Sequence, residues 1–116
     1  MVVSPETPAT LNCSFEIDEL DVSKNGSTYM IAQAEGLGSF QVNETGAYVP
    51  WNGEISSLVP SSTQNFTTSV SLMPFNNIKF ADFGVTNTNL TVFFAYSIAE
   101  TGDLVFTPQG VRVTIQ

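Results

Sequence analysis

The chain has 116 residues, the length of a single domain, and 42% of them are apolar, which is enough to form a core. Three basic residues stand against eleven acidic ones, for a net charge of −8. This balance excludes nucleic acid as a partner, because a phosphate backbone needs clustered Lys and Arg, and it disfavours anionic membrane surfaces.

Catalytic chemistry is restricted by the residue types that are missing. The chain has no His and only one cysteine, Cys13. This excludes an intramolecular disulfide, a Cys/His zinc site and a Ser-His-Asp or Cys-His catalytic site. A glycosidase would need two carboxyl groups across a cleft, and no pattern brings two glutamates together, so we expect no enzyme. The glutamates considered for such a pair are Glu16, Glu35, Glu54 and Glu100.

The first predicted elements are a lead-in and a strand. Residues 1–9 contain two prolines and are predicted to be an extended lead-in or linker, so the predicted domain covers residues 10–116. Residues 10–17 alternate strictly between apolar and polar, which predicts a half-buried strand. Cys13 lies on the apolar face, and we interpret it as a small buried hydrophobic residue.

The middle of the chain is predicted to contain several short strands. Asn25-Gly26 favours a hairpin turn, because both residues tolerate positive φ. Residues 47–51 are predicted to be an edge strand or a bend, because Pro50 lacks an N–H group. Residues 54–62 could form one helical turn or a short strand. Further strands are predicted at residues 27–34, 39–42, 64–72 and 78–85, with a turn around Pro74 and a break near Asp82.

The most regular part of the sequence is its C-terminal end, residues 90–115. The segment 90–98 is apolar on both faces, which is typical of a central strand covered on both sides. Gly102-Asp103 predicts a turn, and residues 104–107 and 111–115 predict two more strands. Pro108 and Gly110 are predicted to let the chain cross or bulge between these two strands.

The whole pattern consists of seven or eight short strands with turn signals about every 8–12 residues, which predicts an all-β, antiparallel β-sandwich. No run of about 18 apolar residues occurs, so no membrane span is predicted. Residues 1–10 lack the pattern of a signal peptide, and we expect any export signal to lie upstream. Low Lys with high Ser, Thr and Asn favours an extracellular or cell-surface location.

One candidate site is a calcium-binding turn. The segment from Asp21 to Gly26 fits part of the calcium-loop pattern D-x-[DN]-x-[DN]-G. Position twelve would be Ala32 and not Glu, and Lys24 adds positive charge, but Asp18, Glu19 and Asp21 could still donate oxygens. The alternative is a hairpin turn with solvated acids. No other cofactor is predicted.

A second candidate site is a sugar-stacking platform. Flat aromatic faces bind pyranose rings, and a neighbouring amide can fix the hydroxyl groups. Tyr48, Trp51 and Tyr96 are the candidate aromatics, and Asn52 is the candidate polar partner. The alternative is that Trp51 packs in the core or at an edge.

Five N-x-[ST] sequons would be glycosylation acceptors if a eukaryotic secretory pathway made the protein. They are Asn12, Asn25, Asn43, Asn65 and Asn89.

Three C-terminal segments, 93–96 (FFAY), 102–106 (GDLVF) and 111–115 (VRVTI), resemble the closing strands of immunoglobulin-like or fibronectin-III-like modules of bacterial surface and secreted proteins. The resemblance implies an immunoglobulin-like sandwich that serves as a spacer, adhesion unit or accessory binding domain. The Cys…Trp…Cys framework of antibody domains is absent, because the chain has one Cys.

We therefore expect a non-catalytic extracellular module of a larger surface or secreted protein, which acts as a spacer, adhesion or assembly unit. Its partners would be neighbouring domains of the same chain and a protein or glycan. The alternatives are a carbohydrate-binding module that uses exposed aromatics, and a subunit of a filament or capsid-like assembly formed by strand addition.

Overall fold

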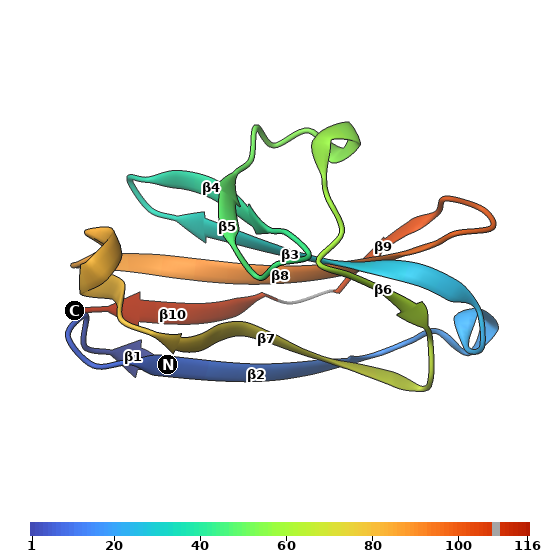
Figure 1. Cartoon of the computed structure of the whole chain (residues 1–116), viewed down its shortest axis with the longest axis horizontal. Helices are drawn as coiled ribbons and strands as arrows, with labels where there is room; N and C mark the ends of the chain where they lie inside the picture. The colour runs from blue at the N-terminus through green and yellow to red at the C-terminus, as the bar shows by residue number, and fades with distance from the viewer. Residues whose placement is uncertain (108–109) are drawn as a thin grey trace.

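The structure is a computed structural model that describes residues 1–107 and 110–116. This part of the chain is all-β, with ten strands and three 3-10 helices (Figure 1). In chain order the elements are β1 (Val2–Val3), β2 (Ala9–Glu16), η1 (Glu19–Asp21), β3 (Asn25–Ala34), β4 (Gly38–Val42), β5 (Tyr48–Pro50), η2 (Ile55–Ser57), β6 (Ser62–Asn65), β7 (Ser69–Ile78), η3 (Phe80–Phe83), β8 (Thr88–Ile98), β9 (Leu104–Phe106) and β10 (Val111–Ile115).

The strands form two sheets. The larger one has eight strands, six of them in the order β1-β10-β8-β3-β4-β5, while β6 pairs with β3 and β9 pairs with β8. The smaller sheet consists of β2 and β7. The expectation of a purely antiparallel arrangement is wrong, because β1 runs parallel to β10, with Val2 opposite Thr114. The larger sheet is therefore mixed.

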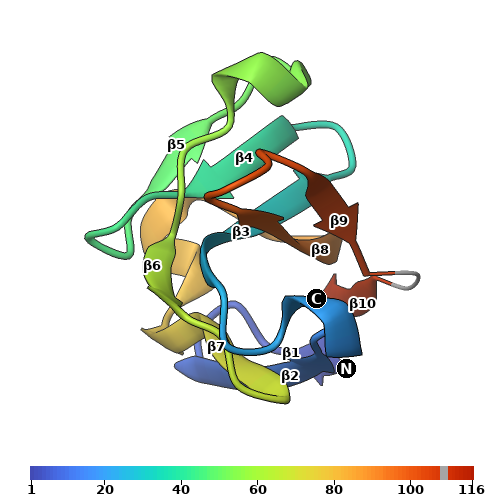
Figure 2. The same cartoon turned by 90° about the vertical axis from the view of Figure 1, so that its right-hand side faces the viewer.

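The two sheets lie face to face with the core between them (Figures 1 and 2). Phe15 of β2 stacks on two rings of β8, with centroid distances of 6.0 Å to Phe94 and 6.1 Å to Tyr96. Strand β8 pairs with β3 on one side and with β10 on the other, so the prediction that it is central is confirmed. Cys13 packs against the core but is only partly buried, and this burial raises the pKa of its thiol.

Several predicted element boundaries are wrong. The predicted strand 64–72 is divided between β6 and β7, because the chain leaves the larger sheet for the smaller one at residues 66–68. The turn predicted around Pro74 lies inside β7, at a shift of register opposite β2, which is a position where a strand tolerates proline. The predicted strand 78–85 contains η3. Of the two alternatives left open for residues 54–62, a helical turn or a short strand, the structure has the helical turn, η2.

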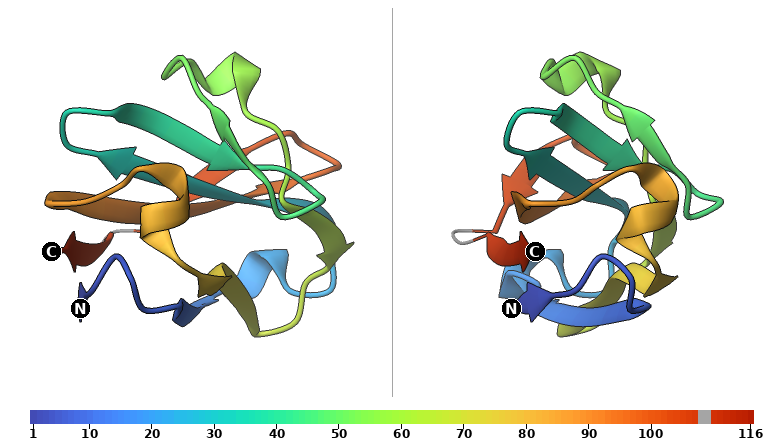
Figure 3. Two further views of the ribbon diagram at one scale, coloured as in Figure 1. Left: turned by 60° about the vertical axis from the view of Figure 1, so that its left-hand side comes forward. Right: turned by 90° about the vertical axis from the view of Figure 1, so that its left-hand side faces the viewer.

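The two ends of the chain lie side by side at one edge of the larger sheet (Figure 3). The amide of Thr114 donates to the carbonyl of Met1 at 2.8 Å, and the amide of Gln116 donates to the carbonyl of Val3 at 3.1 Å. Strand β5 occupies the opposite edge of the same sheet. Gly110 directly precedes β10, whereas Pro108 lies outside the described residues.

The helices of residues 1–107 and 110–116 are at most four residues long, and none has the length and apolar character needed to cross a membrane.

Candidate functional site

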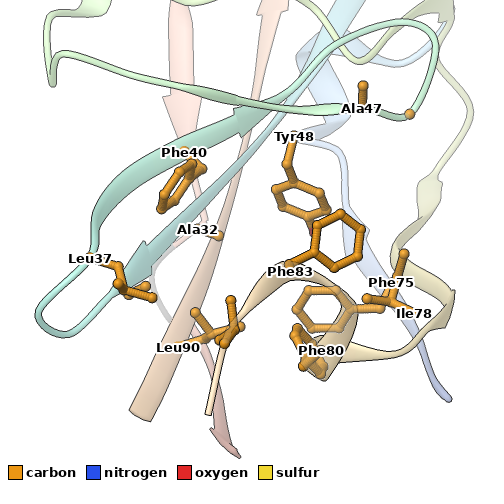
Figure 4. Close-up of a pocket in the computed structure, with 13 residues that line it drawn as sticks. Ala32, Leu37, Phe40, Ala47, Tyr48, Phe75, Ile78, Phe80, Phe83 and Leu90 are labelled. Atoms are coloured by element: carbon orange, nitrogen blue, oxygen red, sulfur yellow. The ribbon is translucent and has the colours of Figure 1, made fainter. Parts of the chain in front are cut away.

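A cavity of about 580 Å³ lies between the β4–β5 side of the larger sheet and the β7–η3 segment (Figure 4). Strands β3, β4, β5, β7 and β8, the helix η3 and the turns beside them contribute to its walls. Its volume falls within the usual range for small-molecule sites. The lining residues are Ala32, Ala34, Leu37, Phe40, Gly46, Ala47, Tyr48, Phe75, Ile78, Phe80, Phe83, Val85 and Leu90.

The cavity exists because small side chains face large rings. Ala32 and Ala34 are two positions apart in β3, so both point to the same face of the sheet and leave space there. Opposite them, Phe75 makes an edge-to-face contact with Phe80 at a centroid distance of 5.1 Å and stacks on Tyr48 at 6.1 Å. These aromatic contacts fix the wall opposite the two alanines. The cavity is therefore a consequence of how the two sheets pack.

Two large apolar side chains line the cavity and are nevertheless exposed. Phe83 of η3 is 69% exposed, and Leu37 of the β3–β4 turn is 53% exposed. In Figure 4, Leu37 lies on the β4 side of the cavity and Phe83 on the η3 side. A single exposed apolar residue is ordinary, but two that line one cavity place apolar surface at its mouth.

The walls offer almost no polar chemistry. Tyr48 has the only polar side chain among the described residues that line the cavity, and its hydroxyl already donates to the carbonyl of Pro74. Burial raises the pKa of the Tyr48 phenol far above its usual value, so this group stays neutral. Among the described residues that line the cavity, none has a carboxylate, amine, thiol or imidazole group, and such walls are suited to contact with hydrocarbon.

The predicted sugar platform is not assembled on one surface. Tyr48 lines the cavity, whereas Trp51, three residues further along an extended segment, points to the other side. The indole Nε1 of Trp51 donates to the carbonyl of Glu54 at 2.9 Å and to Ser57 Oγ at 3.1 Å. Asn52 Oδ1 accepts from the amide of Glu54 at 2.9 Å. Trp51 and Asn52 therefore stabilise the loop to which they belong through hydrogen bonds within residues 51–57. Sugar binding stays a prediction.

Tyr96, the third candidate aromatic, lies in the core and is 2% exposed. Its hydroxyl donates to Asp21 Oδ2 at 2.9 Å and accepts from the amide of Asp18 at 3.3 Å. Burial raises the pKa of this phenol; the hydrogen bond from the Asp18 amide lowers this pKa in part, and the Asp21 carboxylate adds to the rise. Its ring is unavailable for stacking on a ligand, but its hydroxyl ties the 18–21 turn to the larger sheet.

The acids of the predicted calcium turn have structural partners. Asp18 Oδ1 accepts from the amide of Leu20 at 3.0 Å and caps η1, and Asp21 lies 3.8 Å from the Lys24 ammonium group. Glu19 is exposed in η1. In the part of the chain that the structure describes, no three His, Cys, Asp or Glu side chains are grouped to hold a metal ion. Calcium binding stays a prediction that this geometry does not support.

Several sequon asparagines also make structural hydrogen bonds. Asn65 Nδ2 donates to Asn25 Oδ1 at 3.2 Å across the β3–β6 pair, and Asn89 Nδ2 donates to Glu35 Oε2 at 3.2 Å. Asn43 Oδ1 accepts from the amide of Thr45 at 3.0 Å. These contacts give the four asparagines structural roles, and glycosylation of the sequons stays a prediction.

The cavity itself was missed by sequence reasoning. One signal could have found part of it: Phe80 and Phe83 are three residues apart, so a 3-10 turn places them on one face. The positions of Ala32, Ala34 and the rings opposite carry no local signal, because they meet only through tertiary packing.

No protein-family model matches the chain, and the searches of curated proteins and of solved structures found no significant match. The function is therefore inferred from the geometry of the site.

Proposed function

We propose that the chain is a non-catalytic, immunoglobulin-like β-sandwich module of a larger secreted or surface protein, and that it acts as a binding or adhesion unit through its apolar cavity. The observation that carries this proposal is the cavity of about 580 Å³, in whose walls the described residues place no charged side chain. A concave apolar site without reactive groups is suited to holding a ligand and not to transforming it.

The strand order supports the immunoglobulin-like part of the proposal. The order β10-β8-β3-β4-β5 opposite β2 and β7 corresponds to a G-F-C sheet extended by two further strands, as in variable-type domains, opposite strands B and E. Strand β6 departs from that pattern, because it pairs with β3 and not with β7. The proposed extracellular location is supported by the net charge of −8 and the low Lys content.

Assembly by strand addition is the second candidate, because β5 is the last strand of the larger sheet. A free edge strand can pair with another chain. However, Pro50 belongs to this three-residue strand and supplies no N–H group, which weakens the edge as a template.

The proposal predicts that the neutral apolar dye N-phenyl-1-naphthylamine binds to the protein and that Ala34→Leu weakens this binding at least tenfold. The leucine adds three carbons inside the cavity, so it removes space for the dye without adding charge. Dye fluorescence during titration measures the affinity, and thermal unfolding checks that the variant is folded.

Ala99→Leu is the matched control, because the same substitution is made at an exposed turn residue. It should bind the dye as the wild type does. Equal dye affinity in the wild type and Ala34→Leu, or no dye binding by the wild type, would disprove the proposed binding role of the cavity.

A further inference from the structure

The cavity walls require the enclosed part of a ligand to be hydrocarbon. Within residues 1–107 and 110–116, Tyr48 Oη is the only polar side-chain atom in the lining, and its hydrogen already points to the Pro74 carbonyl. A polar group placed in such a site would lose its hydrogen bonds to water and find few partners in the walls, which is costly. A methylene group gains from the same transfer.

The charges around the cavity disfavour an acidic ligand. The three basic residues of the chain each lie close to an acid: Lys79 Nζ is 3.5 Å from Glu6 Oε2, and Arg112 and Lys24 have their own acidic partners at 3.9 Å and 3.8 Å. None of the lining residues that the structure describes is basic. Lys79, next to the lining residue Phe80, is the basic residue nearest in sequence to the lining, and it is already paired with Glu6, so a carboxylate at the mouth would have to compete with Glu6 for it.

The size and shape of the cavity fit one flexible chain. A methylene group takes up about the same space as a water molecule in the liquid, roughly 30 Å³, so 580 Å³ sets an upper limit of about 19 methylenes. Strands, a 3-10 helix and turns all contribute to the wall. A flexible aliphatic chain can adapt to such a wall by rotation about its C–C bonds.

From these three observations we infer that the cavity binds an uncharged amphiphile with a single aliphatic chain, such as a long-chain alcohol or ester. This inference rests on the proposed binding function and names its ligand class. The aliphatic chain of the ligand enters the space between Ala34 and Phe75, and its polar head stays at the mouth beside Leu37 and Phe83. The Phe83 ring covers the aliphatic chain where it leaves the cavity.

The test is displacement of the bound dye by 1-hexanol, 1-octanol, 1-decanol and 1-dodecanol, each kept below its solubility limit and checked for droplets by light scattering. Burial of each methylene should tighten binding about fourfold, or about sixteenfold per two-carbon step. The carboxylates of equal chain length should bind at least tenfold more weakly at pH 7. Phe83→Ala should weaken alkanol binding at least tenfold with an unchanged melting temperature, because this side chain is mostly exposed.

Affinity that is independent of chain length, or carboxylates that bind as tightly as the alcohols, would overturn the inferred ligand class. If the dye binds to the wild type, is blocked by Ala34→Leu and is displaced only by rigid aromatic compounds, the binding function stands and the aliphatic ligand is wrong. If the dye does not bind at all, both fail.

Discussion

Replacing Gly26 with alanine is expected to destabilise the protein by about 3 kcal/mol, a large part of the roughly 5–15 kcal/mol that holds a domain folded. Gly26 lies in β3, and a Cβ atom there would come within 2.0 Å of the Ser97 carbonyl oxygen and 2.4 Å of Phe66 Cε2. The carbonyl belongs to the paired strand β8, so it cannot turn away as a side chain would. Urea unfolding of the wild type and the variant measures the difference.

Gly53→Ala is the control for this substitution. Gly53 has a φ of +85°, and no atom lies within 4 Å of the position that an alanine Cβ would occupy, so alanine meets strain in the backbone but no clash. Its cost is expected to be about 1–2 kcal/mol. Equal losses for the two variants would show that the close approach of β3, β8 and Phe66 is not what requires glycine at position 26.

Phe66→Ala is expected to cost about 3–5 kcal/mol, because it removes a large side chain that is 1% exposed. The Phe66 ring packs edge-to-face against Tyr96 at a centroid distance of 5.3 Å and belongs to a second core cluster with Ile17, Val70 and Ile98. Its loss leaves a hole between the two sheets that neighbouring side chains can fill only in part. Urea unfolding monitored by circular dichroism gives the change in unfolding free energy.

The matched control is Phe83→Ala, the same substitution at the exposed mouth of the cavity. Its expected effect on stability is within about 0.5 kcal/mol, because little of the ring is buried. A loss at Phe66 no larger than that at Phe83 would mean that the cluster around Phe66 does not hold the sheets together.

The local part of the fold could be predicted from the sequence. The alternation of apolar and polar residues along 10–17 corresponds to β2, and the run at 90–98 that is apolar on both faces corresponds to the central strand β8. Both could be recognised because successive side chains of a strand point to opposite faces, which gives the sequence a period of two. The pairing of Val2 with Thr114 could not be predicted, since it is parallel and joins the two ends of the chain. The regular pattern from Phe66 to Leu72 was also misleading, because the residues between β6 and β7 pass from one sheet to the other.

The candidate site could be predicted only in part. Tyr48 is predicted as an aromatic ligand contact and does line a cavity, but it faces inward, and the structure separates it from Trp51. The sequence holds no sign of the cavity, because empty space depends on which small residues meet which large ones across two sheets. Ala34, Phe75 and Phe83 come from separate elements, and no spacing in the sequence connects them.

The most direct test of the central claim, that the apolar cavity is the binding site, is a titration of isotope-labelled protein with 1-decanol followed by NMR. The account predicts chemical-shift changes at Ala34, Ala47, Val85 and Leu90, which line the cavity on four separate segments, and their loss in Ala34→Leu. Shifts centred on Trp51 and Asn52, or no shifts up to the solubility limit of the alcohol, would contradict it.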